Sequence, residues 1–496
     1  MNKKSSALPT IYGLRDFQEN AGQVRRCKII GTIGPASSDP LVMRELLEGG
    51  MDIARLNFSH GQHSDHFQAI QNLRQLSQET KRNVTILQDL QGPKIRAGQL
   101  LNGAIKLVEK ETYTLTYGVE QSDPKVIPID YKNLIDDIKV GDLVLMDDGL
   151  LACVVKAIEG QNAIIEVRDG GLLKSRKGVN FPNSVLSVPT LTEKDNRDLI
   201  FGITNNVDAI ALSFVQTAQD IIQCKNIIKA MGSDIPIIAK IERLAAVENI
   251  EAIAAVADGL MVARGDLGVE GSVEKVPTFQ RKIIAAASRH AKPVIIATQM
   301  LESMIQNPQA SLAEVADVAN AVLEGADCVM LSAEVAAGKY PVACVKKMAA
   351  IIDRVEEWGL KKTPRYFSLP EDGTKWQTHK AIARAACEAA DTLNAKAIIS
   401  LTLTGSITRL IASWRPRTPI IAISPRLDVI KRLGYTWGVY GMVNPLFYNT
   451  DVLLQDLPNL LKSLGLAKRG DFVVITAGIP LTAMGGTNML KINRIP

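Results

Sequence analysis

The stretch from Cys27 to Ser59, CKIIGTIGPASSDPLVMRELLEGGMDIARLNFS, alternates two aliphatic runs with one amphipathic run. Residues 27–34 and 52–59 are predicted to be strands, because each is a short apolar run bounded by polar or turn residues. Residues 38–50 are predicted to be a helix, with Ser38 as its N-cap and Gly49 as its end. A strand, a helix and a second strand in this order indicate parallel strands joined by a helical crossover.

The same alternation continues on both sides of a long interruption. A predicted helix over residues 64–81 and a predicted strand over 83–90 follow the opening stretch. The helical pattern resumes near residue 190, where Thr190 or Thr192 is the candidate cap. Five further strands are then predicted, over residues 208–214, 235–242, 258–266, 292–298 and 327–334. Three strands before the interruption and five after it make eight, the number in a (β/α)8 TIM barrel.

The interruption and the C-terminal part are predicted to be separate units. Residues 92–189 consist of short alternating runs rich in Gly, Val and Asp, which favour a small inserted β-barrel. Four strands near the end, over 395–402, 419–424, 437–443 and 471–478, indicate a doubly wound α/β domain. The predicted division is an N-terminal segment (1–22), the barrel (23–92 and 190–356), the β insertion (93–189) and the C-terminal α/β domain (357–496).

Composition excludes several classes of protein. A formal charge of +5 over 496 residues, without a dense Lys/Arg run, argues against a nucleic-acid-binding protein. No apolar run reaches the length of a membrane-spanning helix, and no secretory-type core follows the N-terminus. The six cysteines show no C-x-x-C spacing, which indicates reduced thiols rather than disulfides or a zinc site. We therefore expect a cytoplasmic enzyme without nucleic-acid or membrane partners.

Polar side chains stand at the ends of almost all the predicted barrel strands. Barrel enzymes carry out their chemistry at the carboxyl ends of their strands, so these side chains are expected to meet at one mouth. Each one alone is about as well explained by a helix cap or a surface ion pair. The residues in question are Arg55, Asn57, Ser59, Asp89, Ser213, Lys240, Glu242, Arg264, Asp266, Thr298 and Glu334.

Two of these strand ends point to a divalent cation. Lys240 and Glu242 are two residues apart, so they face the same side of a strand. Arg264 and Asp266 have the same spacing, and Gly265 between them lets the backbone approach a ligand closely. Two carboxylates with room for water suit Mg²⁺, and a nearby lysine suits a phosphoryl group in transfer. These residues predict a Mg²⁺-dependent barrel enzyme that acts on a phosphorylated or carboxylated anion.

At these residues the sequence closely resembles the pyruvate kinases. The similar segments cover the barrel in the family's order: KIIGTIGPAS, ARLNFSHG, LQDLQGPKIR, KGVNFP, AKIERLAAVENI, DGLMVARGDLGVE, ATQMLESM and VMLSAEVAAGKYP. The resemblance implies transfer of a phosphoryl group from phosphoenolpyruvate to ADP, which yields pyruvate and ATP in glycolysis. It also implies that the β insertion is a lid, that the C-terminal domain is regulatory, and that the chain assembles as a homotetramer.

The resemblance assigns roles residue by residue. Glu242 and Asp266 are expected to hold Mg²⁺, for which Mn²⁺ can substitute, and Lys240 to stabilise the phosphoryl group. Arg55 is expected to bind the phosphate. The backbone of Gly265 and Asp266, with Thr298, is expected to bind the substrate carboxylate, and Thr298 also to help deliver a proton. The residues expected to contact the nucleotide are Asn57, His60, Arg96 and Lys177.

Lys94 departs from the pattern of many family members. Those members bind K⁺ near Asn57, Ser59 and Asp89, and usually have Thr and Glu where this chain has Leu90 and Lys94. Leucine offers no oxygen to K⁺, whereas the lysine ammonium can occupy the cation's place, and two such charges would repel each other. We hypothesise that Lys94 replaces K⁺, so that K⁺ is not required. A solvated hinge lysine is the alternative.

The C-terminal domain contains a candidate phosphate loop. Thr402, Thr404, Gly405 and Ser406 lie between a strand and a helix, where hydroxyls and free backbone N–H groups bind phosphate or simply cap the helix. In the resembling family this region binds a phosphorylated effector. Leu403 and Ile407, and the weakly charged final loop around Gly485, Gly486, Thr487 and Asn488, argue against a bisphosphate. A sugar monophosphate or AMP is the expected effector.

Two other functions compete with this interpretation. A Mg²⁺-dependent barrel lyase or aldolase acting on pyruvate-like substrates would share the metal carboxylates, and ADP-independent turnover would favour it. A non-catalytic protein that binds metabolites usually has a damaged site, but Lys240, Glu242, Asp266 and Thr298 are all present.

Overall fold

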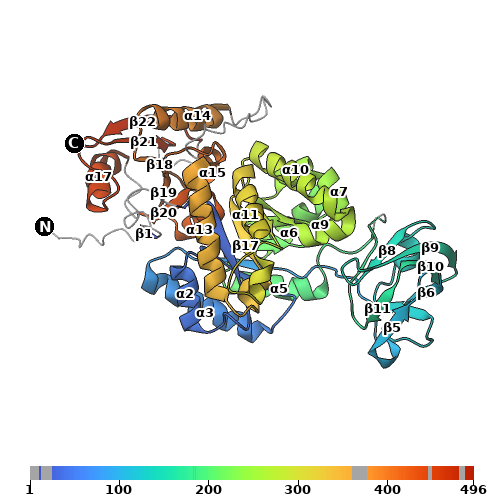
Figure 1. Cartoon of the computed structure of the whole chain (residues 1–496). Helices are drawn as coiled ribbons and strands as arrows, with labels where there is room; N and C mark the ends of the chain where they lie inside the picture. Colours follow the sequence, from blue (N-terminus) through green and yellow to red (C-terminus); the bar gives the residue numbers. More distant parts are fainter. Residues whose placement is uncertain are drawn as a thin grey trace.

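The computed structural model describes residues 11–12, 25–182, 184, 186–359, 377–444, 450–479 and 486–496. Three units lie in a row, with the lid at one end, the barrel in the middle and the C-terminal domain at the other end (Figure 1). The predicted fold class, a (β/α)8 barrel with a β insertion and a C-terminal α/β domain, is confirmed.

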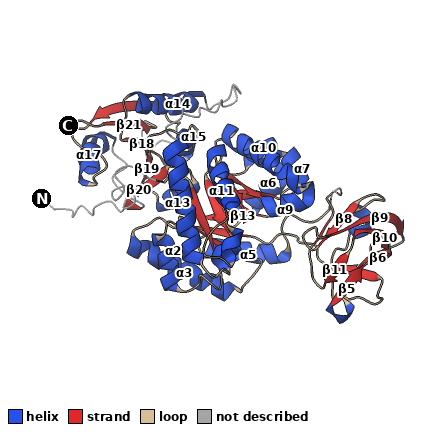
Figure 2. Ribbon diagram, viewed as in Figure 1, coloured by secondary structure: helices blue, strands red, loops and turns tan. Residues whose placement is uncertain are grey.

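The barrel is a closed ring of parallel strands surrounded by helices (Figure 2). Residues 27–34 and 52–59 form its first two strands, as predicted, and the last strand pairs with the first. In ring order the strands are β2 (Lys28–Ile33), β3 (Ile53–Asn57), β4 (Thr85–Asp89), β13 (Ala209–Leu212), β14 (Ile237–Ile241), β15 (Gly259–Ala263), β16 (Val294–Ala297) and β17 (Cys328–Leu331).

Helices follow the barrel strands along the chain. Their apolar stripes pack on the outer face of the ring and form the largest buried cluster there. Gly49 ends the first of them as predicted, but Ser38 is not its cap: the Asp39 side chain accepts from the Leu41 N–H. Thr192 caps α5. The helices are α2 (Pro40–Glu48), α3 (His63–Thr80), α5 (Glu193–Thr204), α6 (Ala218–Ala230), α7 (Leu244–Glu248), α8 (Ile250–Val256), α9 (Arg264–Gly271), α10 (Val276–Arg289), α11 (Leu312–Glu324), α12 (Ala333–Ala336) and α13 (Pro341–Gly359).

The lid has its own apolar core and is almost entirely β. Its six-stranded sheet runs in the order β12-β8-β9-β10-β6-β7, beside a two-stranded pair, β11-β5. Bridges from Arg96 to Gly178 and from Ala97 to Ile129 connect the two edges, so the sheet curls toward a barrel. One short helix, α4 (Leu134–Asp137), was not expected. The strands are β5 (Ala104–Leu107), β6 (Thr112–Tyr117), β7 (Val126–Ile129), β8 (Leu143–Met146), β9 (Leu151–Glu159), β10 (Asn162–Asp169), β11 (Gly171–Lys174) and β12 (Val179–Asn180).

The C-terminal domain is a six-stranded sheet, β1-β20-β19-β18-β21-β22, with a buried apolar cluster on each face. Its inner strands are parallel, as a doubly wound sheet requires, and its edge strands are antiparallel. One edge strand comes from the N-terminal segment. The elements are β1 (Ile11–Tyr12), α14 (Gln377–Thr392), β18 (Ala397–Leu401), α15 (Ser406–Ser413), β19 (Ile420–Ser424), α16 (Leu427–Arg432), β20 (Val439–Val443), α17 (Thr450–Ser463), β21 (Phe472–Ala477) and β22 (Met489–Arg494).

Four aspartates organise the amino end of the barrel, the end opposite the expected active site. One aspartate stands directly before every second strand of the ring. Its carboxylate accepts a hydrogen bond from a backbone N–H of the preceding strand. Each also forms an ion pair with a basic side chain, which compensates for its partial burial. The pairs are Asp52 with Arg25, Asp208 with Arg74, Asp258 with Lys225, and Asp327 with Arg415.

The fourth pair joins the barrel to the C-terminal domain. Arg415 follows α15, and its guanidinium lies 2.9 Å from the Asp327 carboxylate, with both side chains largely buried. Tyr435 from the same domain packs among the residues that fill the inside of the barrel. The C-terminal domain therefore closes the amino end of the barrel and leaves the carboxyl end for the lid.

Replacing Arg415 with leucine is expected to lower the free energy of unfolding by about 3–5 kcal/mol, because Asp327 would remain buried without its charge partner. Urea unfolding followed by circular dichroism measures the change. Arg44→Leu is the matched control: its partner Glu79 is exposed, so the loss should be small beside that of Arg415→Leu. Equal effects of the two substitutions would contradict the interdomain role of Arg415.

Candidate active site

Four charged side chains meet at the carboxyl end of the barrel, from strands β3, β4 and β14. The Asp89 carboxylate accepts from Arg55 Nε at 2.7 Å and lies 3.1 Å from Lys240 Nζ. Lys240 Nζ also lies 2.8 Å from the Glu242 carboxylate. Arg55, Asp89 and Glu242 are at most 9% exposed, so this network is held inside the mouth rather than in bulk water.

Electrostatic interactions within this network keep Lys240 charged. The pKa of Asp89 is lowered: burial alone would raise it, but the charges of Lys240 and Arg55 outweigh burial. Burial also opposes the charge on Lys240, yet Asp89 and Glu242 together raise the pKa of its ammonium. Burial, and then repulsion from Asp266, raises the pKa of Glu242, although Lys240 opposes this. A carboxylate with a raised pKa gains from a further cation, which is the requirement for a metal ligand.

Two hydroxyls support the network. Lys240 donates to Ser213 Oγ at 2.7 Å, and Ser213 donates to the Leu90 carbonyl at 2.6 Å. Arg55 donates from Nη1 to Thr32 Oγ1 at 3.0 Å. Sequence reasoning placed Ser213 at a strand end but missed Thr32, whose position near the end of β2 was the available signal.

Thr298 and Gly265 are brought together between β15 and β16. The Gly265 N–H donates to Thr298 Oγ1 at 3.0 Å, and Arg264 donates twice to the Thr298 carbonyl. Arg264 is itself fixed by an ion pair with Asp317. Thr298 has φ 68°, a left-handed conformation that costs about 1–3 kcal/mol for a β-branched residue and is typical of functional sites.

Helix α9 starts directly at the end of β15, with Asp266 in its first turn. A cleft of about 860 Å³ extends from Gly265 along α9 and is bounded on its far side by lid residues, including Leu145, Asp148 and Pro182. Lid and barrel also touch where Asn180 donates to Glu270 at 3.3 Å. The site therefore opens into a space between the barrel and the lid that is large enough for a small-molecule ligand.

In the described part of the chain, the side chains of the predicted nucleotide residues form no hydrogen bond or ion pair with the Lys240 network, although Asn57 is the strand neighbour of Asp89. Asn57 accepts from the Ser59 N–H, and His60 is exposed. Both lid residues interact with the lid itself: Arg96 donates to the Arg176 carbonyl, and Lys177 lies 2.6 Å from Asp147. The structure does not bring Arg96 and Lys177 to the mouth of the barrel.

The first turn of α5 holds the segment around Asn57 and the start of the lid. Lys194 donates to the Phe58 carbonyl at 2.5 Å and pairs with Asp198. Asp195 accepts from the Gly92 N–H at 3.0 Å. Sequence reasoning missed both residues, because their partners are more than 100 positions away and only the fold brings them close.

The proposed monovalent-cation region includes Leu90 and Lys94, which follow strand β4. Lys94 is exposed on the hinge, and its Cε lies against Gly178 of the lid. Within the described ranges, its ammonium makes no contact with Asn57, Ser59 or Asp89. Leu90 is 1% exposed and packs in the outer core of the barrel.

The candidate phosphate loop lies at the start of helix α15. Gly405, at φ 80°, precedes α15, and its N–H donates to Thr402 Oγ1 at 2.8 Å. The hydroxyl groups of Thr404 and Ser406 form a hydrogen bond of 3.0 Å. Of the final loop, Gly485 lies outside the described residues.

Two carboxylates, not a larger cluster, are available for a metal at the mouth. No group of three or more His, Cys, Asp and Glu side chains with metal-binding geometry occurs in the described ranges. Glu242 and Asp266 feel each other's charge, which suits a hard cation that takes its remaining ligands from water and substrate. These residues fit Mg²⁺.

None of the described helices is long and apolar enough to cross a membrane.

Comparison with known proteins identifies the family. Residues 24–345 match the model "Pyruvate kinase, barrel domain" and residues 380–493 match "Pyruvate kinase, alpha/beta domain". The chain is 43% identical to pyruvate kinase 2 of Synechocystis (94% of this chain, 79% of that protein) and 42% identical to the pyruvate kinase of Mycobacterium tuberculosis (95% and 98%). A crystal structure of a pyruvate kinase from Cryptosporidium parvum superposes with a TM-score of 0.87 at 35% identity (96% and 98%). With both domains matched and relatives this similar over nearly its whole length, the chain belongs to the pyruvate kinase family of enzymes.

Proposed function

We propose that this enzyme transfers the phosphoryl group of phosphoenolpyruvate to ADP in a Mg²⁺-dependent reaction. The proposed catalytic and binding residues are Lys240, Arg55, Glu242, Asp266 and Thr298. The observation that carries this proposal is the Lys240 ammonium, held between two buried carboxylates beside Arg55. A fixed cation of this kind stabilises charge on a phosphoryl group as it passes from donor to acceptor.

In this mechanism the bond between phosphorus and the enol oxygen breaks while a bond to the terminal phosphate of ADP forms. Lys240 and Arg55 neutralise the phosphoryl oxygens in transit. Glu242 and Asp266 would hold Mg²⁺, which when bound supplies further positive charge to the substrate oxygens. The Gly265 N–H and Thr298 Oγ1 would bind the carboxylate, and Thr298 would help pass a proton to the enolate carbon.

The proposed nucleotide site requires the lid to move. Arg96 and Lys177 currently interact within the lid, so rotation about the hinge at Gly92 would have to carry them toward Asn57 and His60. Closure would also exclude water, which competes with ADP for the phosphoryl group. The 860 Å³ cleft along α9 supports this proposal, because it leaves room for that movement.

Pyruvate formation tests the proposal directly. With phosphoenolpyruvate, ADP and Mg²⁺, purified enzyme should yield pyruvate and ATP in equal amounts, and omission of ADP should abolish both products. Pyruvate release without ADP would instead favour a lyase, and no product at all would favour a metabolite-binding protein.

We also propose that Lys94 removes the need for K⁺. Wild-type activity should be equal within about twofold with and without K⁺ in a sodium-free buffer, because the hinge would carry Lys94 toward Asn57 and Asp89 on closure. Lys94→Glu should become at least about tenfold more active with K⁺, since the added ion would restore the missing charge. Lys106→Glu, on the lid surface, is the control. Wild-type activity that disappears without K⁺ would contradict this role.

For regulation we propose that Thr402, Thr404, Gly405 and Ser406 accept the phosphate of a sugar monophosphate or AMP, in a homotetramer. The loop supports this through its hydroxyls and the start of α15. Activation by ribose 5-phosphate or AMP that is lost in Ser406→Ala would support the assignment, and activation that survives the substitution would refute it.

A further inference from the structure

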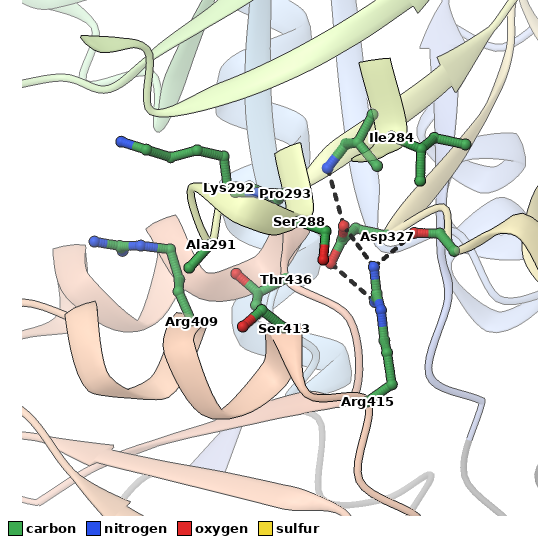
Figure 3. A pocket seen from close by; sticks show the side chains of 12 residues that line it. Ile284, Ser288, Ala291, Lys292, Pro293, Asp327, Arg409, Ser413, Arg415 and Thr436 are labelled. Atoms are coloured by element: carbon green, nitrogen blue, oxygen red, sulfur yellow. Dashed lines mark hydrogen bonds and ion pairs between the residues drawn. The ribbon is translucent and has the colours of Figure 1, made fainter. Parts of the chain in front are cut away.

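A small pocket lies between the amino end of the barrel and the C-terminal domain (Figure 3). It is therefore at the opposite end of the barrel from the catalytic mouth. Its volume is about 20 Å³. The barrel contributes Ser288 and Lys292, from the end of α10 and the following loop, together with Asp327. The C-terminal domain contributes the rest of the polar lining: Arg409, Ser413, Arg415 and Thr436.

Two hydroxyls in this pocket have no partner within the part of the chain that the structure describes. Ser288 Oγ and Thr436 Oγ1 are both buried and neither forms a hydrogen bond. They come from different domains, and Figure 3 shows their side chains around the same space. Ser413 differs, because its hydroxyl donates to the Leu410 carbonyl. Buried hydroxyls normally have a hydrogen-bond partner. These two therefore indicate a bound ion or molecule that accepts a hydrogen bond from each of them.

The charge of the lining favours an anion. Asp327 is the one carboxylate in the lining, and it is saturated by Arg415 and by the backbone N–H groups of Val294 and Trp437. Arg415 is thereby neutralised, which leaves Lys292 and Arg409 as an excess of two positive charges. In the described ranges, the Arg409 guanidinium forms no hydrogen bond or ion pair, although its backbone N–H donates to the Gly405 carbonyl.

The ammonium of Lys292 forms no ion pair among the described residues. It donates to the Ala257 carbonyl at 2.6 Å, which is an uncharged partner. Burial lowers its pKa to about 8; Asp258 opposes this, while Arg409 and Lys225 contribute in the same direction as burial. An anion in the pocket would offset part of the mutual repulsion of Lys292 and Arg409.

Size limits the anion. A space of about 20 Å³ holds one particle of the size of a water molecule. A phosphate or sulfate, with four oxygens around the central atom, is too large without separation of the domains. A halide has the right size and accepts hydrogen bonds from hydroxyls without needing a fixed geometry.

We propose that this pocket binds a chloride ion, held by the hydroxyls of Ser288 and Thr436 in the positive field of Arg409 and Lys292. Because the two hydroxyls belong to different domains, the ion links the barrel to the C-terminal domain next to the Arg415–Asp327 ion pair. Chloride should therefore stabilise the docked arrangement of the two domains.

Bromide provides the direct test. Crystals of the full chain grown in sodium bromide should show an anomalous peak between Ser288 and Thr436, and crystals of the Ser288→Ala, Thr436→Val double variant should lack it. A peak in both, or in neither, would overturn the proposal; a water molecule refined at that position in the wild type would do so as well.

A solution measurement covers variants that do not crystallise. At constant sodium concentration, replacing gluconate with chloride should raise the Tm of the wild type by about 2 °C. The shift should disappear in the double variant and in Arg409→Gln. Ser463→Ala is the control, because it also removes a serine hydroxyl, but one that lies outside the pocket and donates to the Leu460 carbonyl. Equal shifts in all four proteins would show a general salt effect and refute the site.

Discussion

Replacing Lys240 with methionine is expected to lower kcat by about 1,000-fold or more, because in the proposed mechanism the ammonium held between Asp89 and Glu242 stabilises the phosphoryl group in transfer. The affinity for ADP should change little, since the proposed nucleotide residues lie elsewhere. Steady-state rates of pyruvate formation measure both quantities.

The Lys240 test needs controls for folding, because the substitution leaves Asp89 with Arg55 as its one described cation. Lys240→Arg keeps the charge, so it should recover the fold and part of the rate. Lys225→Met removes a lysine–aspartate pair at the opposite end of the barrel and should leave kcat within about twofold of the wild type. A folded Lys240→Met enzyme that retains a tenth of the activity would contradict the assigned role.

Replacing Glu242 with glutamine is expected to raise the Mg²⁺ concentration for half-maximal activity by at least about 100-fold. The amide keeps the shape of the side chain and can still accept from the Phe214 N–H, but it lacks the charge that a divalent cation needs. Titration of the activity with Mg²⁺, and of metal binding by calorimetry, measures the effect.

Glu270→Gln is the matched control for Glu242. Glu270 is also a buried carboxylate near the mouth, but it forms an ion pair with Arg243. Its Mg²⁺ requirement should stay within about threefold of the wild type. An unchanged requirement in Glu242→Gln would exclude this residue as a metal ligand.

Much of the fold could be predicted because its signals are local. Each barrel strand is a short aliphatic run, and each following helix has an apolar stripe, so strand count and order can be read from the chain. The mouth could be located for the same reason, since Lys240, Glu242 and Asp266 occupy strand ends. Boundaries were less certain: the cap of α2 is Asp39 and not Ser38, because neighbouring polar residues compete for one N–H.

Only the tertiary structure decided which of these groups touch. The contact of Arg55 with Asp89, the pairing of Lys177 with Asp147, the exposure of Lys94 and the pocket between Ser288 and Thr436 were not predictable. The sequence by itself determined the elements, their order and the chemistry at the strand ends, because backbone propensity and side-chain period act over a few residues. Which side chains contact each other depends on how distant segments and whole domains pack, and no local pattern encodes that packing.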